Sequence, residues 1–523
     1  MPARVLVIGL DAAEATLIEG WAEAGELPTF ARLAESGAVF ALDRNPLETL
    51  PGAIWPELTT GRSCGALPLY YHPQQLHTGE ARLRPILAQE VDPGDYYWAV
   101  ASAAGRRVAV IDQVQTVPTP DLNGIQLFEW GLHDRNFAIA ADPPGLLDDV
   151  RRRFGDHPIT SCDLHGRSAS GYRALREKLL AGVARKTELL LELMGREAWD
   201  LFTCTFGETH CVGHQFWHFR DAKHPDHDDA APDAMRHAIR DVYRAIDDGV
   251  ARLVREAGED AALVVVASHG MGVYTGGPQL LPEFLVRLGL GSGGDGRASS
   301  AGVRRAQILV THVPRPLQPA LRRLAESAWI RRFQARSGCL LYPLESPSTR
   351  AAALKNNRCG AIRLNLSGRE PFGRIAPGAQ QAALVAEIRG ELLALRQPAS
   401  GEPIVERVVT ADEAFGAGHH PDVPDLMVVF RTDLGVLEDC RSPRVGDIHV
   451  DLFHPNIPRS GDHTTESRMW LRSEGVAAGA RLTGASTLDL APTVLSLLEV
   501  APPRSLGGRS LAPAPAPVLG RAS

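Results

Sequence analysis

The stretch FGETHCVGHQFWHF, residues 206 to 219, holds the densest set of side chains that could do chemistry. His210, His214 and His218 lie four residues apart, a spacing that places them on one face of a helix. Two imidazoles at this spacing are a common way to bind Zn²⁺, because neutral ring nitrogens must converge at roughly 2 Å from the ion. A further ligand must then come from elsewhere in the chain. Taken alone, such a pair is also typical of a helix surface without metal.

Three other side chains are candidate ligands. His269 follows the apolar strand at the start of the stretch VVVASHGMGV. His463 lies in the polar loop RSGDHTTE, and Asp11 follows the apolar run RVLVIGL. Each also has a simpler reading, since a loop histidine is usually solvated and a carboxylate after a strand usually caps the next helix. Glu208, two residues before His210, is a candidate general base or additional ligand, with an exposed loop position as the alternative.

Thr49 is the candidate nucleophile. It precedes Leu-Pro in LETLPGAIWPELTTG, and a helix is predicted to begin near Pro56. A hydroxyl close to both a helix N-terminus and a metal ion can be deprotonated and attack phosphorus. A threonine before a helix is otherwise simply a cap.

The elements that must position these residues are apolar runs separated by helical sequence. This alternation predicts an α/β fold with a central, mostly parallel sheet and helices on both faces. Ligands of such sheets bind beyond the carboxyl ends of the strands. Asp11, Glu208 with His210, and Ser268 with His269 should therefore share one edge. The predicted strands are 4–10, 107–112, 200–206, 262–268 and 425–430, and the clearest helices are 172–195 and 233–258.

Composition limits the classes of partner. The 523 residues are 44% hydrophobic and 22% charged, with a net charge of −7, so the chain has no basic field for a nucleic acid polymer or an anionic membrane. The seven cysteines include no CxxC pair, which indicates free thiols in a reducing compartment. Since no apolar run approaches the roughly 20 residues of a membrane span, we expect a cytoplasmic protein.

The chain divides into four segments. Residues 1–275 and 351–512 are predicted to form the catalytic core, 276–350 an insertion or cap, and 513–523 a flexible Pro/Ala-rich tail. The insertion combines a Gly/Ser-rich patch with basic helical sequence. It is either a lid or specificity element over the site, or a surface loop with a solvated helix.

In this order and at these separations, the segments resemble the alkaline phosphatase superfamily, and most closely its type I phosphodiesterase and nucleotide pyrophosphatase branch. The resemblance covers nearly the whole chain, and collinear motifs are far more specific than any single one. The similar segments are VLVIGLDAAEATLIEGWAEAGELPTFARLAESGAVF, TLPGAIWPELTTG, ETHCVGHQFW, VVVASHGMG, NNRCGAIRLNLSGREPFG, DLMVVF, GDH and TLDLAPTVLSLLEVAPPRSLGGRSL.

The resemblance implies an alkaline phosphatase-like fold with two metal ions roughly 4 Å apart around a phosphate or sulfate group. One ion would be held by His210, His214 and His463. The other would be held by Asp11, His269 and the nucleophile.

Three departures from the family pattern alter this expectation. Ser268 stands where the family usually has an aspartate, which removes a carboxylate from the second metal site. His210 also replaces an aspartate, so the first site becomes three imidazoles, a set that suits Zn²⁺ with an open water position. Thr49 lies two residues further from Gly61 than the family spacing, which falls on Pro51. Either the loop has an insertion and Thr49 attacks, or a metal-bound water attacks.

These features predict a metal-dependent hydrolase of a small-molecule phosphate ester, either a phosphodiester or a phosphomonoester, with one or two divalent ions, Zn²⁺ by preference. A single-metal hydrolase of a sulfate, phosphonate or acyl bond is the first alternative. A degenerate family member that binds a ligand without turnover is the second. The substrate and the oligomeric state stay open.

Overall fold

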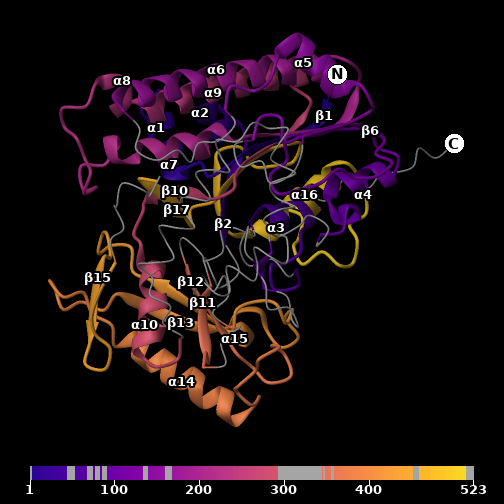
Figure 1. Ribbon diagram of the computed structural model, residues 1–523. Helices are drawn as coiled ribbons and strands as arrows, with labels where there is room; N and C mark the ends of the chain where they lie inside the picture. The colour runs from indigo at the N-terminus through magenta and orange to yellow at the C-terminus, as the bar shows by residue number, and fades with distance from the viewer. Residues whose placement is uncertain are drawn as a thin grey trace.

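The computed structural model describes residues 3–43, 54–67, 75–76, 83–84, 91–132, 139–159, 168–291, 344, 348–354, 359–450 and 459–513. Its largest element is a nine-stranded sheet in the order β19-β2-β18-β9-β1-β8-β5-β6-β7 (Figure 1). These strands are β1 (Ala3–Leu10), β2 (Ala38–Asp43), β5 (Val108–Ile111), β6 (Gly124–Phe128), β7 (Ala140–Asp142), β8 (Trp199–Phe206), β9 (Ala262–Ala267), β18 (Arg468–Arg472) and β19 (Ala480–Ser486).

The centre of this sheet is parallel. β1 pairs in parallel with β8 and β9, β5 pairs in parallel with β8 and β6, and β19 pairs in parallel with β2. Only β18 and β7 run antiparallel to their neighbours. Parallel strands need long crossover connections, and the helical segments between the strands supply them. The predicted mostly parallel sheet is confirmed.

Helices cover both faces of the sheet, as predicted. Side chains alternate along β1, so that Leu6, Ile8 and Leu10 pack against one layer of helices while Val5 and Val7 pack against the other. The first layer comprises α1 (Ala15–Glu23), α2 (Pro28–Ser36), α5 (Leu146–Phe154), α6 (Ala169–Met194), α7 (Glu208–Arg220), α8 (Asp233–Arg236) and α9 (Ala238–Ala257); the second comprises α3 (Ile54–Thr60), α4 (Tyr97–Ala103), η3 (Pro93–Asp95), η7 (Thr487–Asp489) and α16 (Leu490–Leu497).

The helix predicted over 172–195 is α6, and the one predicted over 233–258 is α8 with α9, interrupted at His237. The helix expected near Pro56 is α3. Among the residues that the structure describes, no helix combines the length and the apolar character needed to cross a bilayer.

A second sheet lies apart from the first, in the lower part of Figure 1. Its four strands are antiparallel in the order β11-β12-β14-β13, and it has its own apolar core with α10 and α14. The elements of this part are η4 (Gly277–Leu280), α10 (Leu281–Arg287), β11 (Ala351–Leu354), β12 (Cys359–Leu364), α14 (Ala379–Leu393), β13 (Val405–Thr410), α15 (Ala411–Phe415) and β14 (Leu426–Phe430). Two further strand pairs form separate two-stranded sheets: β15 (Asp439–Ser442) with β16 (Gly446–His449), and β3 (Gln75–Leu76) with β4 (Leu83–Arg84).

The assignment of 425–430 to the parallel sheet was therefore wrong, because this run forms β14 of the second sheet. A short apolar run shows that a strand is buried but not which sheet it joins. The predicted boundaries of the insertion stay a prediction, since most of 276–350 and the tail from 514 lie outside the described residues. Residues 277–291, the first part of the predicted insertion, pack with residues 351–354, which directly follow it, around the core of the second sheet.

A short ribbon lies at the carboxyl end of the main sheet. It consists of β10 (Gly270–Val273) and β17 (Gly461–Thr464), paired antiparallel with Met271 opposite His463. Since β10 begins three residues after the end of β9, the ribbon brings a segment nearly 200 residues further along the chain to this edge. Figure 1 shows it beside α7.

Candidate metal centre

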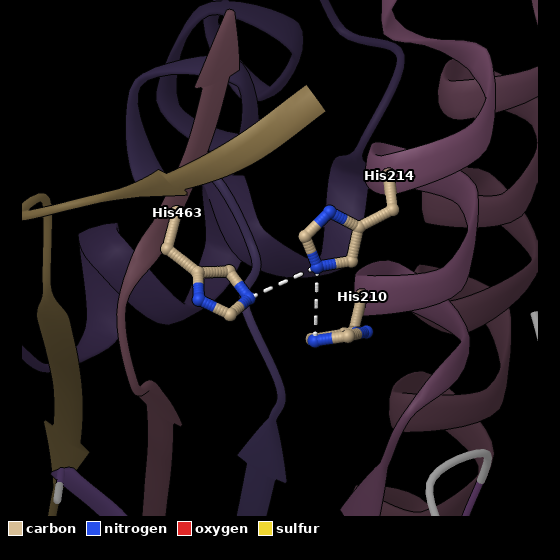
Figure 2. Close-up of side chains that lie close together, drawn as sticks. All are labelled: His210, His214 and His463. Atoms are coloured by element: carbon tan, nitrogen blue, oxygen red, sulfur yellow. Dashed lines mark hydrogen bonds between the residues drawn. The ribbon is translucent and has the colours of Figure 1, made fainter. Parts of the chain in front are cut away.

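Three histidines meet where α7 faces the ribbon. His214 Nε2 lies 3.2 Å from His210 Nε2 and 3.1 Å from His463 Nε2 (Figure 2). One nitrogen from each ring lies within 4.8 Å of the others, and in the described residues this is the one group of at least three ligand atoms so arranged. Ligands 2.0–2.1 Å from a tetrahedral Zn²⁺ are about 3.3 Å from one another. The two separations at His214 therefore match those around a tetrahedral ion.

Two local features create this convergence. His210 and His214 are one turn apart on α7, with ring centroids 4.3 Å apart. β17 can approach α7 closely because position 461 is a glycine, where an added Cβ would lie 2.4 Å from Gly213 O. The Ser460 amide then donates to His214 O at 2.8 Å. His463 is thus brought to the helix face by the contacts that Ser460 and Gly461, just before it, make with His214.

The hydrogen bonds of His214 fix which of its nitrogens faces the group. Its Nδ1 lies 2.6 Å from Gly461 O, and a carbonyl oxygen only accepts, so Nδ1 carries the proton. The lone pair is then on Nε2, toward His210 and His463. A ligating histidine typically donates its second N–H in this way, which orients the ring. His214 is fully buried and His210 nearly so.

Asp11 and His269 lie at the ends of adjacent strands, since β1 and β9 pair with Leu10 opposite Ala267. The ring centroids of His269 and His463 are 4.4 Å apart. Asp11 is buried, and its Oδ1 accepts a 2.7 Å hydrogen bond from Trp55 Nε1 of α3. The carboxylate therefore joins the end of β1 to the helix that follows the predicted nucleophile. Thr49 and Pro51 themselves lie outside the described residues.

Ser268 orients His269. Its Oγ lies 2.9 Å from His269 Nδ1, 3.3 Å from Leu10 O and 3.3 Å from Ala12 N. A hydroxyl has one proton, and donating it to the Leu10 carbonyl leaves the oxygen to accept from His269 Nδ1–H. This network assigns the lone pair of His269 to Nε2.

Glu208 belongs to a different group. It is buried, which excludes the exposed loop position, and its Oε1 lies 2.9 Å from His157 Nε2. Burial raises the pKa of this carboxyl group, but the Lys186 charge and the His157 hydrogen bond outweigh it and leave the pKa below its usual value. Lys186 in turn contacts Asp112 at 3.1 Å. Glu208 is not among the ligand atoms that the three histidines bring together.

Sequence reasoning missed His157, Lys186 and Asp112, which surround Glu208. One signal was available: Lys186 lies on the apolar stripe of the helix predicted over 172–195, a position where a lysine must have a buried partner. Asp112 ends a predicted strand, as Asp11 does. His157 carried no sequence signal of its partner, which is 51 residues away.

His218, the third histidine of the predicted helix face, does not join the group. Its ring centroid lies 3.9 Å from that of Phe219 and 5.6 Å from that of Tyr172. Two steps of four residues rotate a side chain about 80° around a helix of 3.6 residues per turn. His218 therefore points to the aromatic cluster, where burial is the main cause that lowers its pKa to about 4.

The architecture is that of an α/β protein with candidate histidine and aspartate ligands at the carboxyl edge of a mostly parallel sheet. Residues 5–279 match the family Type I phosphodiesterase / nucleotide pyrophosphatase. This match spans more than half of the chain, and the protein belongs to this family. Membership indicates a hydrolase of phosphoric esters in a family whose members depend on metal ions.

The sequence matches no curated protein significantly. Among solved structures, murine ectonucleotide pyrophosphatase / phosphodiesterase 5 in complex with AMP is 10% identical, with a TM-score of 0.48 over 96% of each chain. Phosphonoacetate hydrolase from Sinorhizobium meliloti 1021 in complex with phosphonoacetate is 13% identical, with a TM-score of 0.49 over 95% of this chain and 96% of that one. At these values the likeness bears on neither the substrate nor the ligands of this chain.

Proposed function

We propose that the protein is a metal-dependent hydrolase of a small phosphate ester, with a divalent ion, Zn²⁺ by preference, held by His210, His214 and His463. The observation that carries the proposal is the approach of three Nε2 atoms, with two of the distances at 3.1 and 3.2 Å. Three uncharged imidazoles without a carboxylate are a set that binds Zn²⁺ and leaves a position open. A bound ion there supplies a Lewis acid for a phosphoryl oxygen and activates water near neutral pH.

The chain's own residues hold this arrangement in place. The Gly461 carbonyl keeps the proton of His214 on Nδ1, and α7 fixes the ring of His210 one turn away. Since the ligating nitrogens are preset, binding of an ion needs little rearrangement of buried groups. The phosphate ester would lie at the open side of the three rings, where the ends of β1 and β9 deliver Asp11 and His269.

Asp11 and His269 are the proposed ligands of a second ion. Their strands are adjacent, and His269 lies beside His463. The hydroxyl of Ser268 supplies no charge where the family usually has a carboxylate, so we expect this second position to bind a divalent ion less tightly than the first. Thr49 is the proposed nucleophile, with attack by water as the alternative.

A direct role of Glu208 in proton transfer stays a prediction. Its closest partner is His157, and its charge is balanced by Lys186 on the helix layer behind the site. A carboxylate with a lowered pKa that is engaged in this way is a poor proton acceptor at neutral pH. We infer that Glu208 acts mainly by fixing the first turn of α7, which carries His210.

The test combines metal content with turnover. Protein purified without chelator is analysed by elemental mass spectrometry, and hydrolysis is followed with bis(p-nitrophenyl) phosphate and p-nitrophenyl phosphate before and after metal removal. We expect at least one Zn²⁺ per chain and activity that is lost with the ion and restored by it. A chain that binds no divalent ion after reconstitution, or that hydrolyses only a sulfate, phosphonate or carboxylic ester, would contradict the proposal.

A further inference from the structure

Glu14 joins three segments that carry candidate ligands. It is buried at the N-terminus of α1, three residues after Asp11. Its Oε1 accepts hydrogen bonds from Thr16 N at 3.3 Å and Thr16 Oγ1 at 2.6 Å. Its Oε2 accepts from Met271 N and Thr464 Oγ1, both at 2.9 Å. One carboxylate therefore links the segment after β1 to both strands of the ribbon.

We propose that Glu14 is a positioning residue for the metal centre: it holds the β10–β17 ribbon, and with it His269 and His463, in register with Asp11 and α7. The inference rests on the proposed function, because it assigns Glu14 a task only where these side chains bind an ion. Among the residues that the structure describes, the hydrogen bonds of the Glu14 carboxylate go to Thr16, Met271 and Thr464 and to none of the proposed ligands. It acts through the main chain of β10 and the hydroxyl of Thr464.

The positions of its partners explain why a small displacement would matter. Met271 is two residues after His269 and is paired with His463, and Thr464 directly follows His463. Position 270 between them is a glycine, and an added Cβ there would lie 2.2 Å from Glu14 Oε2 and 2.1 Å from Thr464 Oγ1. The carboxylate therefore lies directly against the ribbon. Any shift of the ribbon moves two candidate ligands together relative to α7 and β1.

Helix capping does not account for a carboxylate with this arrangement. A cap of α1 needs one oxygen, and Oε1 provides it through Thr16. Oε2 makes no bond to α1 and serves the ribbon alone. In the part of the chain that the structure describes, all of these bonds come from uncharged donors, so the two halves of the carboxylate can be tested separately through the two threonines.

The experiment compares two isosteric changes on the same carboxylate. Thr464→Val removes the hydroxyl bond between the carboxylate and the ribbon and leaves the bond from Met271 N. Thr16→Val removes the corresponding hydroxyl bond to the helix, leaves the bond from Thr16 N and serves as the matched control. The dissociation constant of Zn²⁺ is measured by competition with a chromophoric chelator, and the visible absorption of the Co²⁺-substituted protein reports ligand geometry. Glu14→Ala removes all four hydrogen bonds of the carboxylate, and the double variant Glu14→Ala with Thr464→Val tests whether Glu14 and Thr464 act as one unit.

We expect Thr464→Val and Glu14→Ala to weaken Zn²⁺ binding roughly tenfold and to alter the Co²⁺ spectrum, as outer-sphere changes typically do. Thr16→Val should leave both unchanged, and the double variant should bind as Glu14→Ala does. Unchanged Zn²⁺ affinity in Thr464→Val and Glu14→Ala, or equal losses in Thr16→Val and Thr464→Val, would overturn the positioning role while leaving the metal centre standing. A wild-type protein that binds neither ion would overturn the metal centre, and the positioning role with it.

Discussion

Two groups of polar side chains each include a residue from the start of α7, His210 in one and Glu208 in the other, and they differ in the charges that they contain. The three-histidine group brings together three imidazole nitrogens and contains no carboxylate. The group of Glu208, His157, Lys186 and Asp112 pairs its charges internally, with contacts of 2.9 and 3.1 Å. Buried carboxylates that have a lysine beside them are stabilised by a charge of the protein itself, whereas converging lone pairs are stabilised by an added cation.

This difference distinguishes candidate ligands from residues that stabilise the fold, although the sequence places both kinds at the same edge of the sheet. Asp11, Asp112, Glu208 and His269 all lie at or just after the ends of strands in the main sheet. What distinguishes them is the set of partners that each finds. A carboxylate next to a buried lysine stabilises the fold, and a histidine whose second nitrogen is fixed by a carbonyl or hydroxyl is prepared to bind an ion.

The largest effect that the comparison predicts is on His214. His214→Ala should lose the bound ion and reduce kcat/KM by at least about 100-fold, because the central nitrogen of the group disappears while the fold keeps α7. His218→Phe is the matched control, since it lies one turn further along the same helix among aromatic rings. Metal content and hydrolysis of bis(p-nitrophenyl) phosphate are measured for both. Retention of metal by His214→Ala would remove the distinction between the two groups.

The charge network should respond in stability instead. Burial lowers the pKa of Lys186, but the carboxylates of Asp112 and Glu208 raise it by more than burial lowers it. The net shift is upward, so the ammonium group stays charged. Lys186→Met leaves two carboxylates without their cation and should cost about 3–5 kcal/mol of unfolding free energy, measured by urea denaturation. Lys178→Met, at an exposed position on the same helix, should change it by less than about 0.5 kcal/mol. Loss of the ion from folded Lys186→Met would show that the two groups are not independent.

His218 gives a pH test next to the metal group. Its pKa is about 4 when folded against 6.5 for the free side chain, chiefly through burial. A lowered histidine pKa means that the unfolded chain takes up the proton first, so stability is full above pH 6.5 and falls as the pH drops toward 4. His218→Phe should remove at most about 3 kcal/mol of this acid sensitivity, measured by urea unfolding between pH 7 and 4. Parallel pH profiles for the two proteins would contradict this assignment.

The sequence predicted the fold where local patterns were long. The apolar runs of β1, β8 and β9 are nearly continuous, as expected of parallel strands buried on both faces, and the helices between them impose the crossovers. The run that forms β14 looked the same over six residues and joined the other sheet. Which sheet a strand joins depends on contacts distant in sequence, and a short run carries no record of them.

The same limit applies to the candidate site. The spacing of His210 and His214 predicted their convergence, whereas His463, 249 residues from His214, was placed beside them only through the family resemblance. Glu14 had the position of an ordinary helix start, and nothing local indicated that half of its carboxylate reaches a ribbon 450 residues away. Local geometry is readable from spacing, but partners across the fold are not.

The smallest predicted effect concerns Ser268, which orients a candidate ligand but is not itself one. Its hydroxyl holds His269 as Gly461 O holds His214, but with no charge of its own. Ser268→Ala should therefore leave the ion of the three-histidine group in place and weaken a second ion by up to about tenfold. Stepwise Zn²⁺ titration of the metal-free protein separates the two binding events, and Ser467→Ala, which removes a hydroxyl bonded to Ala267 O in the same region, is the control. If Ser268→Ala weakens the first ion instead, His269 belongs to the three-histidine group, and the protein has a four-histidine centre rather than two unequal sites.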